Sequence, residues 1–222
     1  MNKKPSIMIV GPDRSGKTHI GHELSKRLGV PYYKASSEKG AFLNKQERFI
    51  MDLRYSCPAR FDLLKQIGCG VVFDRGYPCE WVYSTYFNRP TDYDALRELD
   101  EKWSSEGLVM VFCTRRSFDG IVDDLNPKLQ GTELKRIHDL YVQYFKTCTL
   151  CKVITVEVDD HDLERQVTEI ISQLLGTHVK TSPYPLAAST QRRKPRQEVH
   201  PHRGFELADL RHQSHQHGEG EP

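Results

Sequence analysis

Short apolar runs recur along the chain, and stretches with a helical pattern separate them. The runs are rich in β-branched residues and do not alternate with polar ones, which is typical of strands buried on both faces of a parallel sheet. Four such strands are predicted, and a further stretch is compatible with a fifth. The four cover residues 6–10, 71–73, 108–112 and 153–158, and the fifth covers residues 30–35.

Apolar residues between these runs repeat at helical spacing. Ile20, Leu24 and Leu28 recur every four residues before Gly29, and a longer apolar face within residues 163–175 stops at Gly176. Two more helices are predicted over residues 91–105 and 133–146, which are rich in Leu, Tyr, Glu and Lys. Strands that alternate with helices indicate an α/β fold, so we expect one domain over residues 1–176.

The helical pattern fails after Gly176. Residues 177–222 are rich in proline, histidine and basic residues and carry almost no periodic apolar content, so they are predicted to be a disordered, basic, His-rich tail. A cluster of His212, His215 and His217 could bind a metal, but an exposed His-rich tail is usually only solvated. The isolated C-x-x-C of Cys148 and Cys151 is likewise a weak signal for zinc or redox chemistry.

Composition and charge narrow the class of protein. Apolar residues make up 37% of the chain, and no window approaches the ~18 consecutive apolar residues of a membrane span. The 32 Lys and Arg nearly balance the 30 Asp and Glu, so the net charge of +2 offers no broad surface for duplex nucleic acid. We therefore expect a cytoplasmic protein with reduced cysteines that acts on small molecules, with nucleic acid disfavoured as a partner.

The strongest local motif follows the first predicted strand and precedes the first predicted helix. It fits G-x-x-x-x-G-K-[ST] at every fixed position, and its backbone N–H groups and the helix N-terminus would converge on one anion. Lys17 would place its charge on the outer phosphates, and the Thr18 hydroxyl would ligate Mg²⁺. We therefore expect ATP and Mg²⁺ as cofactors. The expected ATP-binding residues are Gly11, Pro12, Asp13, Arg14, Ser15, Gly16, Lys17 and Thr18.

A second polar anchor ends the strand over residues 71–73. Asp74 and Arg75 follow that strand directly, and the carboxyl ends of strands in such a sheet face the ligand crevice. Asp74 is placed to hold the Mg²⁺ hydration shell, and Arg75 is placed to pair with a phosphate through two hydrogen bonds.

These two segments resemble the thymidylate kinases. The loop from Gly11 to Thr18, with Asp13 and Arg14 inside it, looks like the phosphate loop of that family, and residues 74–83 are similar to its D-R-Y-x-x-S-x-x-A-[YF] segment. The resemblance spans roughly residues 5–175 and implies a P-loop kinase with a five-stranded parallel sheet and helices on both faces. It also implies that Asp13 approaches the acceptor and that Arg14 neutralises charge on the transferred phosphoryl group, as a catalytic residue beside Lys17.

The resemblance extends to the acceptor site. Family members carry a helix arginine about twenty residues before the Asp-Arg pair, and Arg54 stands at that position, with Arg60 as its nearby competitor. The arginine expected before the acceptor loop is replaced by Ala35, so Lys34 or Lys39 would have to substitute for it. The aromatic residues Tyr77, Trp81 and Tyr83 could form a stacking wall for a base or belong to the core.

Arg115 and Arg116 follow the strand over residues 108–112 and precede a polar stretch that ends at Gly131. This region resembles the mobile lid of P-loop kinases, which closes over the phosphates. We expect at least one of these arginines to reach ATP and assign both to the catalytic set. The alternative is a solvated loop with surface arginines.

The expected function is therefore ATP- and Mg²⁺-dependent phosphoryl transfer to a deoxynucleoside monophosphate, with dTMP as the first candidate and a homodimer as the assembly that the resemblance implies. A deoxynucleoside kinase is an alternative, with Glu38 or Glu80 as the base that a hydroxyl acceptor benefits from. A P-loop kinase acting on a modified base in DNA is another. A GTPase-like binding module is disfavoured because the chain lacks the N-K-x-D signature.

Overall fold

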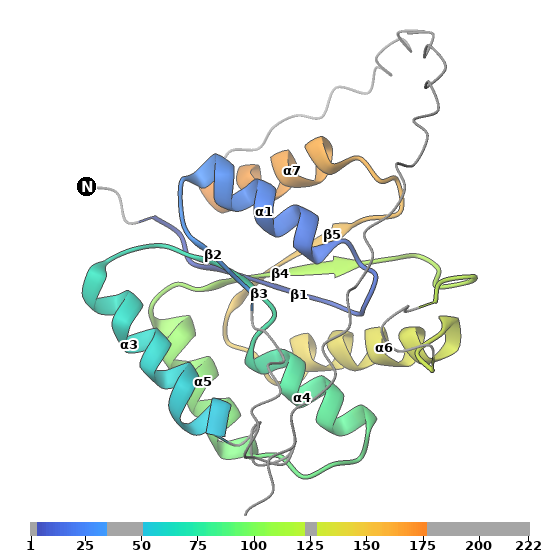
Figure 1. Cartoon of the computed structure of the whole chain (residues 1–222), viewed down its shortest axis with the longest axis horizontal. Helices are drawn as coiled ribbons and strands as arrows, with labels where there is room; N and C mark the ends of the chain where they lie inside the picture. Colours follow the sequence, from blue (N-terminus) through green and yellow to red (C-terminus); the bar gives the residue numbers. More distant parts are fainter. Residues whose placement is uncertain (1–3, 35–50, 123–127, 177–222) are drawn as a thin grey trace, which may run out of the picture. The chain divides into compact units, whose positions relative to one another are not determined.

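The computed structural model describes residues 4–34, 51–122 and 128–176. Its core is a parallel sheet in which the strand order is β2-β3-β1-β4-β5 (Figure 1). Every pair of neighbouring strands is parallel, so consecutive strands along the chain are joined by crossovers that carry helices. The strands are β1 (Ile7–Val10), β2 (Tyr32–Lys34), β3 (Val72–Asp74), β4 (Val109–Thr114) and β5 (Lys152–Glu157).

Helices cover both faces of this sheet. Helices α1 and α7 lie on one face, whereas α3, α4, α5 and α6 lie on the other (Figure 1). A π-helical turn, η1 (Asp52–Ser56), runs directly into α3. The helices are α1 (Lys17–Leu28), α3 (Cys57–Ile67), α4 (Tyr77–Tyr86), α5 (Tyr93–Ser105), α6 (Gly131–Thr147) and α7 (Leu163–Leu175).

Strands β1, β3, β4 and β5 each contribute to two separate cores because their side chains alternate between the faces of the sheet. Ile7 and Ile9 of β1 pack with the apolar faces of α1 and α7, whereas Met8 and Val10 pack with the helices of the opposite face. All four residues of β1 are buried. This burial on both faces explains why the strands read as unbroken apolar runs rather than as alternating patterns.

The five predicted strands and the four predicted helices are all confirmed, with ends that shift by a few residues. Helix α4 was not predicted as an element, and α3 was expected only as the helix that carries the arginines. Of α3, only Cys57 and Phe61 are buried, which leaves too weak an apolar period to detect. The predicted tail and its histidine cluster lie outside the described residues. Within the described ranges, no helix is long and apolar enough to span a membrane.

Candidate functional site

The loop from Gly11 to Gly16 connects β1 to α1 and is shaped by unusual backbone angles. Arg14 and Gly16 adopt left-handed conformations, with φ of 64° and 70°. Gly11 lies so close to β4 that a Cβ atom there would meet the Cys113 carbonyl oxygen at 2.4 Å. The Ser15 hydroxyl donates to the Pro12 carbonyl oxygen at 2.8 Å. The loop is therefore held against the sheet at the N-terminus of α1, where backbone N–H groups favour an anion.

Lys17 lies inside this loop and is only 5% exposed. Its Nζ donates to the Pro12 carbonyl oxygen and to Ser15 Oγ, the latter at 3.2 Å. Burial and the positive charge of Arg75 lower the pKa of Lys17 to about 8. A phosphate bound in the loop would raise the pKa of Lys17 again, because its negative charge favours the ammonium form of the side chain.

The predicted metal ligands Thr18 and Asp74 lie together. The Thr18 hydroxyl donates to Asp74 Oδ2 at 2.7 Å, and the Tyr32 hydroxyl donates to the same oxygen at 2.8 Å. Asp74 is 1% exposed, and its other oxygen, Oδ1, is buried without a hydrogen-bond partner among the described residues. A buried carboxylate oxygen without a donor is costly unless a cation or an ordered water serves it. Thr18 and Asp74 therefore fit a hydrated Mg²⁺, which prefers hard oxygen ligands and retains several waters.

Asp13 and Arg75 form an ion pair beside the loop. The backbone N–H of Arg75 donates to the Ile9 carbonyl oxygen at 2.9 Å, which fixes this residue next to β1. Tyr83 of α4 donates its hydroxyl to Asp13 Oδ2 at 2.7 Å. Burial raises the pKa of Asp13, but Arg75, Lys17 and the Tyr83 hydroxyl outweigh burial, so its pKa lies below the ordinary value. Asp13 is thus a carboxylate at neutral pH.

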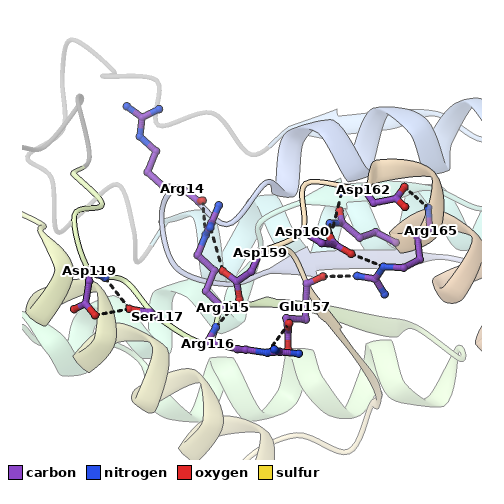
Figure 2. A network of polar contacts seen from close by, with 11 residues as sticks. Arg14, Arg115, Arg116, Ser117, Asp119, Glu157, Asp159, Asp160, Asp162 and Arg165 are labelled. Atoms are coloured by element: carbon purple, nitrogen blue, oxygen red, sulfur yellow. Dashed lines mark hydrogen bonds and ion pairs between the residues drawn. The ribbon is translucent and has the colours of Figure 1, made fainter. Parts of the chain in front are cut away.

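Arg115 and Arg116, the two arginines that follow β4, differ in position. Arg115 Nε donates to the Arg14 carbonyl oxygen at 3.2 Å, so its guanidinium lies against the phosphate loop (Figure 2). The Arg116 side chain is 81% exposed and pairs with Glu157 at 2.7 Å. The Arg14 side chain extends away from both in Figure 2. We predicted that at least one of these arginines reaches the nucleotide, and Arg115 is the one whose position is compatible with that role.

The candidate acceptor residues are less closely gathered than the residues around the phosphate loop. Lys34 is in register with Asp74 at the end of β2 and is exposed. Arg54 of η1 forms an ion pair with Asp92, the N-cap of α5. Arg60 donates to the Tyr33 hydroxyl at 2.7 Å. Both helix arginines thus contact neighbouring elements of this chain, and the acceptor loop with Lys39 lies outside the described residues.

The proposed aromatic wall separates into core and site residues. Tyr77 is 2% exposed, and its hydroxyl donates to Asp100 at 2.8 Å, so it belongs to the core and cannot stack on a base. Trp81 packs against Tyr144 with ring centroids 5.5 Å apart. Tyr83 alone of the three contacts the phosphate-loop residue Asp13.

Glu80 is held in an ion pair rather than presented to a substrate. Arg89 donates to both of its carboxylate oxygens, and the Thr91 hydroxyl donates to Oε1 at 2.9 Å. The residue is 9% exposed. A carboxylate with these partners joins the first turn of α4 to the segment between α4 and α5, and it is poorly suited to accept a substrate proton. Glu38, the other candidate base, lies outside the described residues.

Two site residues escaped sequence reasoning. Tyr32 contacts Asp74 across the sheet, and Asp159 contacts Arg115 from the turn after β5. Neither belongs to a recognisable local motif. Asp159 follows the carboxyl end of β5, and that position was the available signal, because the carboxyl ends of parallel strands share one edge of the sheet. Tyr32 begins β2, so its position in the strand gave no such signal.

The sequence matches no protein-family model and no curated protein, whereas a comparison with solved structures finds similar chains. The YorR protein of Bacillus subtilis, solved with phosphorylated GDP, is 18% identical with a TM-score of 0.53, over 78% of this chain and 96% of that one. Deoxyadenosine kinase from M. mycoides is 21% identical with a TM-score of 0.48, over 77% and 99%. Thymidylate kinase from Ehrlichia chaffeensis is 18% identical with a TM-score of 0.47, over 77% and 98%.

At this level of identity the likeness to the YorR protein establishes the fold. In this chain the parallel sheet carries helices on both faces, and a loop with the G-x-x-x-x-G-K-[ST] pattern connects β1 to α1. The chain therefore has a P-loop NTPase fold with a five-stranded parallel sheet.

Proposed function

We propose that the chain is an ATP- and Mg²⁺-dependent kinase that transfers the γ-phosphoryl group to a deoxynucleoside monophosphate, with dTMP as the first acceptor to test. The observation that carries this proposal is the junction of the phosphate loop with the Thr18–Asp74 pair, where a buried carboxylate oxygen has no partner among the described residues. A nucleotide phosphate and its cation would satisfy these groups together.

The chain's own residues would perform the donor half of the reaction. The loop's N–H groups and Lys17 would bind the outer phosphates, while Thr18 and Asp74 would hold Mg²⁺, which neutralises charge that develops on the phosphates. Arg115 would add a cation at the mouth of the loop. Phosphoryl transfer asks a protein mainly for positioning and electrostatic stabilisation, and these groups supply both.

The acceptor half favours a phosphate over a hydroxyl. A phosphate oxygen is ionised at neutral pH and needs no general base, whereas a hydroxyl benefits from one. The lowered pKa of Asp13 makes it a weak base, and Glu80 is held by Arg89. Lys34 and Arg75 place cations at the sheet edge where an acceptor phosphate would lie.

The test measures ADP release with Mg-ATP against dTMP, dUMP, dCMP, dGMP, dAMP, thymidine and DNA that contains 5-hydroxymethyluracil. We expect turnover with one or a few monophosphates, and Lys17→Met should abolish it. Lys26→Met provides the matched control, because Lys26 lies in the last turn of the same helix, away from the loop. Turnover on thymidine alone would establish the nucleoside kinase instead.

We also propose that residues 1–176 form the catalytic domain. Helix α7 ends at Gly176, whose backbone N–H donates to the Ser172 carbonyl oxygen. This helix is the last one that packs on the sheet among the described residues, so the packed fold is complete at Gly176. Deletion of residues 177–222 should leave kcat within a few-fold. A collapse of activity or of thermal stability would contradict this assignment.

A further inference from the structure

Asp159 lies in the turn between β5 and α7 and contacts two consecutive residues after β4. Its Oδ2 accepts from the backbone N–H of Arg116 at 2.7 Å, and its Oδ1 accepts from Arg115 Nη1 at 3.3 Å (Figure 2). The Val158 N–H donates to the Thr114 carbonyl oxygen at 3.1 Å, which extends the contact between β4 and β5 to the residue before Asp159. The carboxylate is therefore fixed relative to β4 by main-chain as well as side-chain contacts.

Arg115 is held from two sides by this arrangement. Asp159 contacts one end of its guanidinium, and Nε donates to the Arg14 carbonyl oxygen at 3.2 Å. The side chain is 13% exposed. Nη2 makes no hydrogen bond within the described ranges, so it remains able to donate to an anion at the mouth of the loop.

The neighbouring carboxylate, Asp160, performs a different task. Its Oδ2 accepts from Arg165 Nε at 2.6 Å and its Oδ1 accepts from Gln166 Nε2 at 2.9 Å, so it braces the first turn of α7. Figure 2 shows the two carboxylates side by side in one turn, with separate arginine partners. This division offers a matched pair of substitutions.

We propose that Asp159 is a positioning residue that sets the Arg115 guanidinium against the phosphate loop, where it contacts the γ-phosphoryl group of the donor. The proposal rests on the function proposed above. A free arginine side chain loses much rotamer freedom when it is held in one geometry. Because Asp159 restricts the rotamers of Arg115 in the free protein, ATP binding does not have to order this side chain, and the guanidinium is already oriented toward the phosphate.

The experiment compares Asp159→Ala with Asp160→Ala in the full chain. Asp159→Ala should weaken ATP binding by about tenfold and lower kcat by a similar factor, while ADP affinity stays within about twofold, because only ATP carries the γ-phosphate. Asp160→Ala should leave both nucleotide affinities near those of the wild-type chain. Binding of ATP and ADP is measured by calorimetry, and thermal unfolding confirms that each variant is folded.

A second measurement separates positioning from simple structural support. The double variant Asp159→Ala/Arg115→Ala should be no worse in kcat than Arg115→Ala alone, since Asp159 acts through Arg115. Added guanidinium ion should restore part of the turnover of Arg115→Ala and restore less in the double variant. Effects that multiply, or an Asp159→Ala variant with wild-type ATP affinity, would overturn the proposal.

The same variants distinguish this proposal from the proposed function. If the wild-type chain binds Mg-ATP but phosphorylates none of the acceptors, the proposed kinase activity fails. The ratio of ATP to ADP affinity in Asp159→Ala and Asp160→Ala still decides the role of Asp159 in that case.

Discussion

The Thr18 hydroxyl donates a 2.7 Å hydrogen bond to Asp74 Oδ2, although the two residues lie 56 positions apart in the sequence. Tyr32 donates to the same oxygen, so both donors orient the carboxylate and leave Oδ1 directed elsewhere. Groups that orient a metal-binding carboxylate commonly affect metal affinity as well. This relationship makes Tyr32 a testable part of the site.

Tyr32→Phe removes the hydroxyl that donates to Asp74 and keeps the aromatic ring. We expect the Mg²⁺ concentration needed for half-maximal turnover to rise about three- to tenfold. The stabilisation against heat that Mg-ATP confers should shrink in the same variant, which is a readout independent of turnover. Tyr33→Phe is the control, since the Tyr33 hydroxyl contacts Arg60 rather than Asp74. Equal Mg²⁺ dependence in the two variants would exclude an orienting role for Tyr32.

The pKa of Lys17, lowered to about 8 by burial and by Arg75, predicts proton uptake when ATP binds. At pH 8 about half of the free protein carries an uncharged Lys17, and bound phosphates favour the charged form. Calorimetry at pH 8 in Tris and in HEPES should therefore give different apparent enthalpies, because these buffers differ in ionisation enthalpy. Lys26→Met should preserve that difference. Identical enthalpies in both buffers would contradict the buried, partly neutral lysine.

Lys17 should also affect how stability depends on pH. Its pKa is lower in the folded chain than in the unfolded one, so between about pH 8 and its ordinary pKa the unfolded chain binds the extra proton. Stability then rises with pH in that window. The difference in free energy of unfolding between wild type and Lys17→Met should grow in favour of wild type from pH 8 to pH 10. Urea denaturation at a series of pH values measures it, and a difference that stays flat would refute this linkage.

Asp100 is a buried carboxylate that contacts none of the phosphate-loop residues in the described hydrogen bonds, and it should matter for stability alone. It is 2% exposed and accepts from the Leu150 N–H at 2.6 Å, the Thr149 hydroxyl at 2.7 Å and the Tyr77 hydroxyl at 2.8 Å. Asp100→Ala removes the buried carboxylate that these three donors share and should cost about 3 kcal/mol in urea denaturation.

The control for that substitution is Asp94→Ala on the same helix, because the Asp94 side chain is 83% exposed. It should change stability by about 0.5 kcal/mol or less. KM for ATP should stay unchanged in both variants. A stable Asp100→Ala variant would mean that ordered water replaces the lost carboxylate.

Glu80→Gln tests the nucleoside kinase alternative. If Glu80 only joins α4 to α5 through Arg89 and Thr91, the substitution should lower stability by about 2 kcal/mol while the pH–rate profile keeps its shape. A base, by contrast, would lose its acidic limb and most of kcat on removal. Measurement of kcat against pH distinguishes the two, and loss of the acidic limb would restore Glu80 as a catalytic candidate.

The sheet was predictable because a buried parallel strand must be apolar on both faces, a pattern visible in a single sequence. The phosphate loop was predictable because its glycines and lysine lie within eight consecutive residues. Tyr77 could not be placed, since an aromatic residue after a strand serves a core as well as a ligand. Its buried contact with Asp100 depends on packing between α4 and α5.

The contacts of Asp159 and Tyr32 were equally hidden. Each depends on two strands being neighbours in the sheet, β2 and β3 for Tyr32 and β4 and β5 for Asp159, and a single sequence does not reveal which strands pair. If the strand order were known, every residue at the end of a strand could be proposed as a candidate site residue. The choice among them still requires distances, because charged residues at strand ends are common.

The π-helical turn at Asp52–Ser56 determines which way its arginine faces. An α-helix turns about 100° per residue, so an extra residue in one turn rotates everything before it by that angle relative to α3. Arg54 meets Asp92 at the start of α5, while Arg60 meets Tyr33 on β2. Deleting one residue between Arg54 and α3 would rotate Arg54 by about a quarter of a circle relative to that helix, so the length of this turn decides whether Arg54 can meet Asp92.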